Sequence, residues 1–308
     1  MPDLERQLQK ARDLSWRAHG KRLEIFLPGM FTAYGRRGRY PAVSITGAAC
    51  QQGCDHCRGR LLTTMRPALD AEELYALGKR LAAEGQEGML LSGGSDPWGR
   101  LPWDKVLPAI ARLSAETGLV LTAHVGRIDE PTARALKQAG ISQALVDVVG
   151  SQGTAQRVLH LADGLAAQSE TLAACRAVGL EVVPHLILGL DHGQMHGEER
   201  ALEIVAALEP KRVVFVVLMP LKGTPLAGVQ PPSPAEAARF MAQARQRLPR
   251  ARHHLGCARP RGRHRQELDA LAVRAGINAL AIPSDGALDQ ARALGVEVSY
   301  RDTCCSLG

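Results

Sequence analysis

Short apolar segments recur along the chain at intervals of about 25 to 40 residues, and each is followed by a stretch in which apolar residues return every three or four positions. The first pattern predicts a buried strand and the second an amphipathic helix. Their alternation is typical of repeated βα units around a parallel sheet. We predict eight strands, over residues 42–46, 89–93, 119–125, 144–149, 181–188, 213–219, 253–257 and 278–282.

The segments between these strands carry the end signals of helices. Ser233, Pro234 and Glu236 have the pattern of an N-cap, a first-turn proline and an N3 acid. Gly140 and Gly179 each precede an apolar residue at the point where a helix should end. This repetition predicts an α/β fold, a (β/α)8 TIM-type barrel that is closed or partly open, with its active site at the carboxyl ends of the strands. A six-unit open barrel with a C-terminal extension is the nearest alternative.

Residues 1–40 stand outside the repeat. Leu4, Leu8 and Leu14 predict a helix that packs against the barrel. We therefore expect an N-terminal helical extension over residues 1–40 and a barrel over residues 41–308, whose cysteine-containing tail folds over the barrel mouth.

Composition narrows the class of protein. The chain has 308 residues, of which 45% are hydrophobic, and this is enough for one large barrel. Its longest apolar stretch, residues 213–219, is far too short to cross a bilayer, so we expect a soluble, cytoplasmic protein with no membrane partner. The net charge of +7 favours an acidic partner. Only 4% of the residues are aromatic, and the arginine-rich stretch over residues 250–265 has none between its basic residues, so nucleic acid is not expected.

Three of the seven cysteines, Cys50, Cys54 and Cys57, share one short loop after the first predicted strand. The odd total, and a trio too tight for mutual disulfides, indicate a reducing compartment. Three thiolates at this spacing can hold three irons of a [4Fe-4S] cluster and leave the fourth iron free to bind a small molecule. The alternative is a structural zinc site completed by His56, but zinc motifs usually place two pairs of ligands far apart.

Residues 44–57, Ser-Ile-Thr-Gly-Ala-Ala-Cys-Gln-Gln-Gly-Cys-Asp-His-Cys, resemble the signature of the radical S-adenosylmethionine (SAM) enzymes. The resemblance implies that Cys50, Cys54 and Cys57 ligate the cluster and that the open iron binds SAM. An electron from the cluster then splits SAM to a 5′-deoxyadenosyl radical. His56 stands where the family commonly has an aromatic residue, and its planar ring can pack near the adenine.

Other segments resemble the SAM-binding motifs of that superfamily. Gly93 and Gly94 resemble the glycines of a Gly-Gly-Glu motif whose backbone contacts the SAM ammonium, although a serine follows in place of the acid. His185 and Gly189 lie in a run that resembles the strand-five motif near the adenosine, and a satisfied core histidine is the alternative for His185. Asp147 lies in an apolar predicted strand, where an unpaired carboxylate is costly. We expect it to face a polar lumen or a cofactor hydroxyl, or to pair with a barrel arginine or lysine.

Cys257, Cys304 and Cys305 form a second group. Cys257 ends a predicted strand, which on a barrel places it at the active face, and the adjacent pair stands in the tail. If the tail covers the barrel mouth, the three thiolates can hold a second, auxiliary [4Fe-4S] cluster, with Ser306 a candidate fourth ligand. Free thiols are the alternative.

The chain resembles the biotin-synthase-like subset of radical SAM proteins along nearly its whole length. The Leu-Gly-Cys-Ala-Arg-Pro run over residues 255–260 and the terminal cysteine pair most resemble the two-component lipoyl synthases. That resemblance implies a sulfurtransferase that adds sulfur to an octanoyl chain on a lysine of a lipoyl-domain or lipoate-carrier protein. It also implies a homologous second component and an electron donor such as ferredoxin or flavodoxin.

A basic segment could dock such a carrier, because carrier domains are commonly acidic. It contains Arg259, Arg261, Arg263 and Arg265, and a solvated loop is the alternative. Two other functions stay open: a biotin-synthase-like enzyme that acts on a free small molecule, and a noncatalytic electron-transfer iron-sulfur protein.

Overall fold

The computed structural model describes residues 2–33 and 35–308, and its internal contacts divide the chain into two compact units. The first unit contains residues 1–27, 147–151 and 184–308. The second contains residues 28–146 and 152–183.

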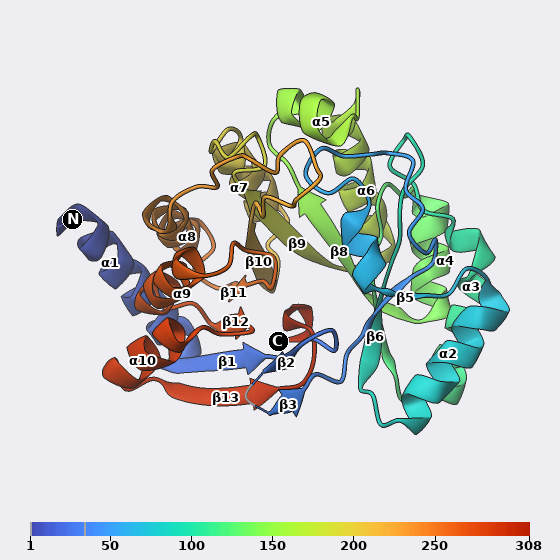
Figure 1. Cartoon of the computed structure of the whole chain (residues 1–308), viewed down its shortest axis with the longest axis horizontal. Coiled ribbons are helices and arrows are strands. Elements are labelled where there is room, and N and C mark those ends of the chain that lie inside the picture. Colours follow the sequence, from blue (N-terminus) through green and yellow to red (C-terminus); the bar gives the residue numbers. More distant parts are fainter. Residues whose placement is uncertain (1, 34) are drawn as a thin grey trace. The chain divides into compact units, whose positions relative to one another are not determined.

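The second unit is built on parallel strands that pair in the order β8-β7-β6-β4-β5. Its helices contact one another along the chain, α2 with α3, α3 with α4, and α4 with α6 (Figure 1). The strands are β4 (Ala42–Ser44), β5 (Arg66–Pro67), β6 (Gly88–Ser92), β7 (Val120–His124) and β8 (Ile141–Val148). The helices are α2 (Ala71–Ala83), α3 (Leu107–Glu116), α4 (Glu130–Ala139), α5 (Gln152–Leu159) and α6 (Gly164–Val178), with 3₁₀ turns η1 (Arg60–Thr64) and η2 (Trp103–Lys105). A small antiparallel pair, β2 (Thr32–Ala33) and β3 (Arg36–Arg37), precedes β4.

The first unit carries parallel strands in the order β13-β1-β12-β11-β10-β9. The strands are β1 (Arg22–Phe26), β9 (Glu181–Leu188), β10 (Arg212–Val217), β11 (Arg252–Leu255), β12 (Ala279–Ala281) and β13 (Glu297–Arg301). The helices are α1 (Pro2–His19), α7 (Glu198–Ala207), α8 (Pro234–Arg247), α9 (Arg263–Arg274) and α10 (Asp285–Ala293), and the chain ends in a 3₁₀ turn, η3 (Cys305–Leu307). Helix α1 packs against α8 and α9 (Figure 1).

The predicted α/β fold of TIM-barrel type is confirmed, in its partly open form, because β13 and β5 each pair with another strand of the sheet on one side only. Each of the eight predicted strands is present, as β4 and β6 to β12. Three further parallel strands, β1, β5 and β13, were not predicted. Residues 22–26 form β1 within the stretch expected to be a helical extension, and β13 has an exposed pattern that no apolar run marks.

Local end signals explain several element boundaries. The Ser233 hydroxyl accepts the backbone N–H of Glu236, whose carboxylate accepts the N–H of Ser233, so α8 begins with the predicted capping box. Helices α4 and α6 end at Gly140 and Gly179, both in the left-handed conformation that favours glycine. These stops set where β8 and β9 begin.

Candidate functional site

The three cysteines of the first candidate site lie together on one loop of the second unit, after β4. The carbonyl of Cys54 accepts the backbone N–H groups of Cys57 at 3.2 Å and of Arg58 at 2.9 Å. This turn brings Cys54 and Cys57 close together, while Cys50 enters the loop from the strand side. The Cys50 Sγ lies 3.9 Å from the carbonyl of Ser95, and the Cys54 Sγ lies 3.7 Å from that of Leu159. Two distant segments therefore hold the loop.

Gly94 is required by the cysteine loop itself. A Cβ at this position would lie 1.9 Å from the carbonyl oxygen of Ala49 and 2.6 Å from the Cα of Cys50. Its N–H donates to the Thr46 hydroxyl at 2.6 Å. At Gly93 a Cβ would lie 3.1 Å from the Ile45 side chain, which is a milder contact. Close packing thus accounts for Gly94 without a ligand, and a SAM contact by either glycine stays a prediction.

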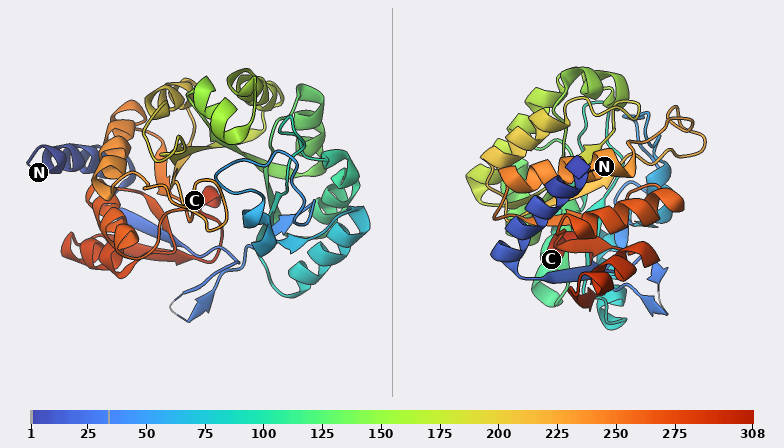
Figure 2. Two further views of the ribbon diagram at one scale, coloured as in Figure 1. Left: turned by 45° about the horizontal axis from the view of Figure 1, so that its top comes forward. Right: turned by 90° about the vertical axis from the view of Figure 1, so that its left-hand side faces the viewer.

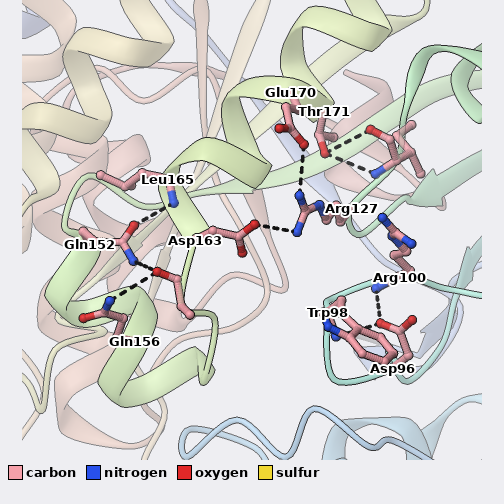
Figure 3. Close-up of polar contacts among 12 residues, drawn as sticks. Asp96, Trp98, Arg100, Arg127, Gln152, Gln156, Asp163, Leu165, Glu170 and Thr171 are labelled. Atoms are coloured by element: carbon pink, nitrogen blue, oxygen red, sulfur yellow. Dashed lines mark hydrogen bonds and ion pairs between the residues drawn. The ribbon is translucent and has the colours of Figure 1, made fainter.

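The turn after the two glycines is closed by Asp96 (Figure 3). Its Oδ1 accepts the backbone N–H groups of Trp98 and Arg100, both at 2.9 Å. The preceding carbonyl, that of Ser95, accepts N–H groups of the cysteine loop from Gln51 at 2.8 Å and Gln52 at 3.2 Å. The acid beside the glycines therefore shapes a turn, at whose tip Trp98 is 63% exposed.

Asp55, between two of the cysteines, is a support that the sequence analysis did not single out. Its Oδ1 accepts from Arg58 at 2.9 Å and lies 3.1 Å from the His160 Nε2. Its backbone N–H donates to the carbonyl of Val158 at 2.8 Å. The end of α5 thus contacts the cysteine loop through both backbone and side chain. No spacing rule marks this contact, because Asp55 and His160 are 105 residues apart.

The second candidate site gathers Cys257, Cys304 and Cys305 within the first unit. Cys257 follows β11, and the adjacent pair follows β13 and enters η3. Burial raises the pKa of the Cys257 thiol, and the nearby Cys304 raises it further. A hydrogen bond with Cys305 lowers the pKa of Cys304, and the same contact raises the pKa of Cys305. The three predicted thiols are therefore neighbours.

The tail that carries Cys304 and Cys305 is packed into this unit. The turn η3 contacts strands β10, β11 and β12 (Figure 2). Cys305 and Ser306 are 4% and 0% exposed. The expected tail is thus an ordered part of the first unit, and its place relative to the cysteine loop stays a prediction.

The remaining predicted SAM contacts have different surroundings. Asp147 is exposed on β8, so its carboxylate does not carry the cost of burial, and what it faces stays a prediction. His185 is buried on β9 and near enough to His254 to affect its pKa. Gly189 has φ of +76°, and a Cβ there would lie 2.3 Å from the Pro232 ring. Backbone geometry explains that glycine, and the roles of the three residues toward SAM stay predictions.

Gly189 is also tied to Glu198, the first residue of α7. The Gly189 N–H donates to the Glu198 Oε1 at 2.8 Å. Glu198 is 7% exposed, and its Oε2 has no hydrogen-bond partner among the described residues. Burial raises the pKa of this carboxyl.

The basic segment proposed for docking is not a continuous surface. Arg259 is fully buried and pairs with Asp269, with Nε to Oδ1 at 2.7 Å and Nη2 to Oδ2 at 2.9 Å. Arg265 is half-buried, and its Nη2 lies 3.4 Å from the carbonyl of Cys257. Only Arg261 and Arg263 of this segment are exposed. The prediction that Arg259 contributes to docking is wrong, because an exposed charge was assumed where the fold uses a buried one.

The described part of the second unit also contains a cavity of about 600 Å³ beside α4 and α6. Arg127 lines it and donates to Asp163 at 2.8 Å and Glu170 at 3.1 Å (Figure 3). Arg100 lines it as well. None of the predicted site residues lies in this cavity.

Cysteine chemistry decides which group the two sites could hold. Within residues 2–33 and 35–308, no three or more His, Cys, Asp or Glu side chains are placed to hold a single metal ion. In a cubane [4Fe-4S] cluster each cysteine binds its own iron at a separate corner, so the thiols need not converge on one metal ion. Three thiols on one loop, with a glycine where a side chain would displace Cys50, fit such a cluster.

Two solved structures share the fold of this chain. Methylornithine synthase (PylB) superposes with a TM-score of 0.66 and 15% identity, over 98% of this chain and 90% of that one. The [FeFe]-hydrogenase maturase HydG gives a TM-score of 0.66 and 16% identity, over 90% of this chain and 61% of that one. Both likenesses concern the fold of the chain.

The sequence is similar to biotin synthases. The biotin synthase of Pelotomaculum thermopropionicum is 28% identical over 246 residues, which cover 78% of this chain and 75% of that protein. That of Xylella fastidiosa strain M12 is 27% identical over 246 residues, 77% of this chain and 70% of that protein. No protein-family model matches the chain. The chain is thus similar to biotin synthases over about three quarters of its length.

A search of the described helices finds none that is both long and apolar enough to span a membrane.

Proposed function

We propose that this chain is a radical SAM enzyme that adds sulfur to an unactivated carbon, as one component of a two-protein lipoyl synthase. The observation that carries the proposal is the gathering of Cys257, Cys304 and Cys305 in the first unit. A second set of cysteines is unnecessary for SAM cleavage alone, but it gives a sulfur-inserting enzyme a place to hold sulfide.

The cysteine loop would hold the first cluster through Cys50, Cys54 and Cys57. A [4Fe-4S] cluster bound there supplies an open iron for the amino and carboxylate groups of SAM and the electron that cleaves it. The chain's own part is to fix the loop. Asp55 and the carbonyl of Ser95 hold its backbone, and Gly94 leaves room for it. His56, half-buried in the loop, is proposed to pack near the adenine.

Cys257, Cys304 and Cys305 would hold the auxiliary cluster, which supplies the sulfur atom when it is bound. Cys304 lies beside both other thiols, since it forms a hydrogen bond with Cys305 and affects the pKa of Cys257, and this placement supports the assignment. Ser306 contacts Cys304 and is a candidate for the remaining ligand.

The proposed partners are an octanoylated lipoyl-domain or lipoate-carrier protein, a homologous second component, and a ferredoxin or flavodoxin as electron donor. Exposed arginines such as Arg261 and Arg263 are the part of the basic segment that could dock an acidic carrier. Exposed charges of this kind mainly raise the rate of association with an acidic partner.

A biotin-synthase-like enzyme that acts on a free small molecule is the second candidate. It is favoured by the relatives named above, which are biotin synthases that match over about three quarters of this chain. Such an enzyme needs the same first site but no docking surface for a carrier.

Two measurements test the proposal. After anaerobic reconstitution we expect about eight irons per wild-type chain and about four in the Cys257→Ala, Cys304→Ala, Cys305→Ala variant. Equal iron contents would eliminate the second cluster. Release of 5′-deoxyadenosine should then depend on an octanoylated carrier, and mass spectrometry should show sulfur on that carrier. Release that ignores the carrier and responds to a small molecule would favour the second candidate.

A further inference from the structure

Two side chains of the sheet hold the backbone of the C-terminal turn. On β10, the Arg212 Nη1 donates to the carbonyl of Ser306 at 2.7 Å. On β11, the His254 Nδ1 donates to the carbonyl of Cys305 at 2.5 Å. His254 is fully buried. The carbonyls of two successive tail residues are therefore fixed by two adjacent strands.

The protonation state of His254 follows from this contact. A carbonyl can only accept, so Nδ1 carries the hydrogen and Nε2 presents a lone pair. The Nε2 is buried and has no hydrogen-bond partner among the described residues. An unpaired buried nitrogen is costly, and an apolar side chain would avoid that cost. The hydrogen bond from Nδ1 to the Cys305 carbonyl therefore explains why this position is a histidine.

The last residue of the described chain is packed against the same ring. A Cβ at Gly308 would lie 3.0 Å from the His254 Cε1 and 2.6 Å from the Phe26 Cζ. The turn is thus enclosed by β1, β10 and β11, and its conformation leaves Cys304 beside Cys257.

We propose that His254 and Arg212 are positioning residues for the second cysteine site. They fix the carbonyls of Cys305 and Ser306, so that the tail thiols stay gathered with Cys257 before any cluster is bound. The inference rests on the proposed function, since that function assigns the auxiliary cluster to these thiols. It adds that the site is pre-formed by the fold rather than created by iron.

The first test uses the full chain freed of iron, with no turnover. His254→Leu removes the donor, while His254→Asn keeps an N–H close to the position of Nδ1. The matched control is His253→Leu, because His253 is an equally buried neighbour on β11 that faces the Leu248 carbonyl instead. Alkylation of each thiol is followed by mass spectrometry. Cys175, which is fully buried in the second unit, reports on global opening in the same sample.

We expect Cys305 to be alkylated at least about tenfold faster in His254→Leu than in wild type. A tenfold change corresponds to destabilising the closed tail by about 1.4 kcal/mol relative to the open one. His254→Asn and His253→Leu should stay within a few-fold of wild type, and Cys175 should be unchanged throughout. Arg212→Met should expose Cys305 in the same way. Protection of Cys305 in both His254→Leu and Arg212→Met would overturn the inference, as would equal acceleration in His253→Leu.

The second test separates this inference from the proposed function. Reconstituted wild type should bind about eight irons and His254→Leu about four, with His254→Asn restoring the wild-type content. Eight irons in both wild type and His254→Leu would refute the positioning role and leave the second cluster intact. Four irons in wild type would refute the second cluster, and the alkylation result would still decide whether the tail is held by His254.

Discussion

The buried ion pair between Arg259 and Asp269 should contribute more to stability than the exposed arginines around it. Both side chains are fully buried. Arg259 also donates to the carbonyls of Gly256 at 2.6 Å and Ile282 at 3.0 Å, and Asp269 accepts the N–H of Ser284 at 2.9 Å. The pair therefore joins the ends of β11 and β12 to α9.

Replacing one partner leaves the other charge buried. For Arg259→Met we expect a loss of about 3 to 5 kcal/mol in the free energy of unfolding, because the buried Asp269 carboxylate loses its cation and keeps the hydrogen bond from the Ser284 N–H. Asp269→Leu should cost a similar amount. The double variant loses both charges and leaves three backbone groups unpaired, at about 1 kcal/mol each. We therefore expect it to cost about 3 kcal/mol, well below the sum of the single variants.

Urea unfolding followed by circular dichroism measures these differences, and peptide-level hydrogen exchange over α9 locates them. Arg263→Met is the matched control on the same helix, because the Arg263–Glu267 pair is exposed and should contribute less than about 1 kcal/mol. A cost below about 1 kcal/mol for Arg259→Met, or a double variant equal to the sum of the singles, would refute the reasoning. A carrier-docking role for Arg259 would instead predict weak binding with unchanged stability.

Three further outcomes are expected. Gly94→Ala should lower iron bound at the first site, because its Cβ would meet the backbone of the cysteine loop, and Gly93→Ala should have a smaller effect; equal iron contents in the two reconstituted variants would contradict this. Cys50→Ala should abolish release of 5′-deoxyadenosine while leaving about four irons at the second site, as measured by iron analysis. Burial raises the pKa of Glu198, so the folded state binds its proton more tightly than the unfolded state, and stability falls as pH rises from the usual value of 4.5 through the raised one. Glu198→Gln should remove this pH dependence in urea titrations from pH 4 to pH 8, and an unchanged slope would be evidence against it.

Periodicity was enough to predict the repeating part of the fold. The strand predicted over residues 181–188 has those bounds in the structure, since the helix stop at Gly179 and the turn at Gly189 frame a mostly apolar segment. Strand β13 escaped prediction because most of its residues are exposed, so it carries no apolar signal. Strand β1 escaped because it lies directly after a strongly helical segment. Both are held by pairing with each other, which is a long-range property.

At the candidate sites, the sequence identified the candidate ligand residues better than it predicted their burial and their contacts. The cysteine spacing is local, so Cys50, Cys54 and Cys57 could be singled out from the sequence alone. The exposure of Asp147 and the burial of Arg259 depend on which way a strand residue faces and on what packs over a loop. The residue pattern alone does not determine these properties, because a shift of one residue in strand register turns each side chain to the other face of the sheet.

The supports of both sites are remote in sequence from the cysteines they hold, and this has a consequence for the whole proposal. The first loop depends on Ser95 and His160, and the tail depends on Arg212 and His254. Each set of supports lies in the same unit as its own cysteines. The two sites should therefore load iron independently, so that a variant in one leaves the other near full occupancy. A chain in which both iron contents fall together after His254→Leu would mean that the tail supports the first site as well, and the two sites could then no longer be treated as separate.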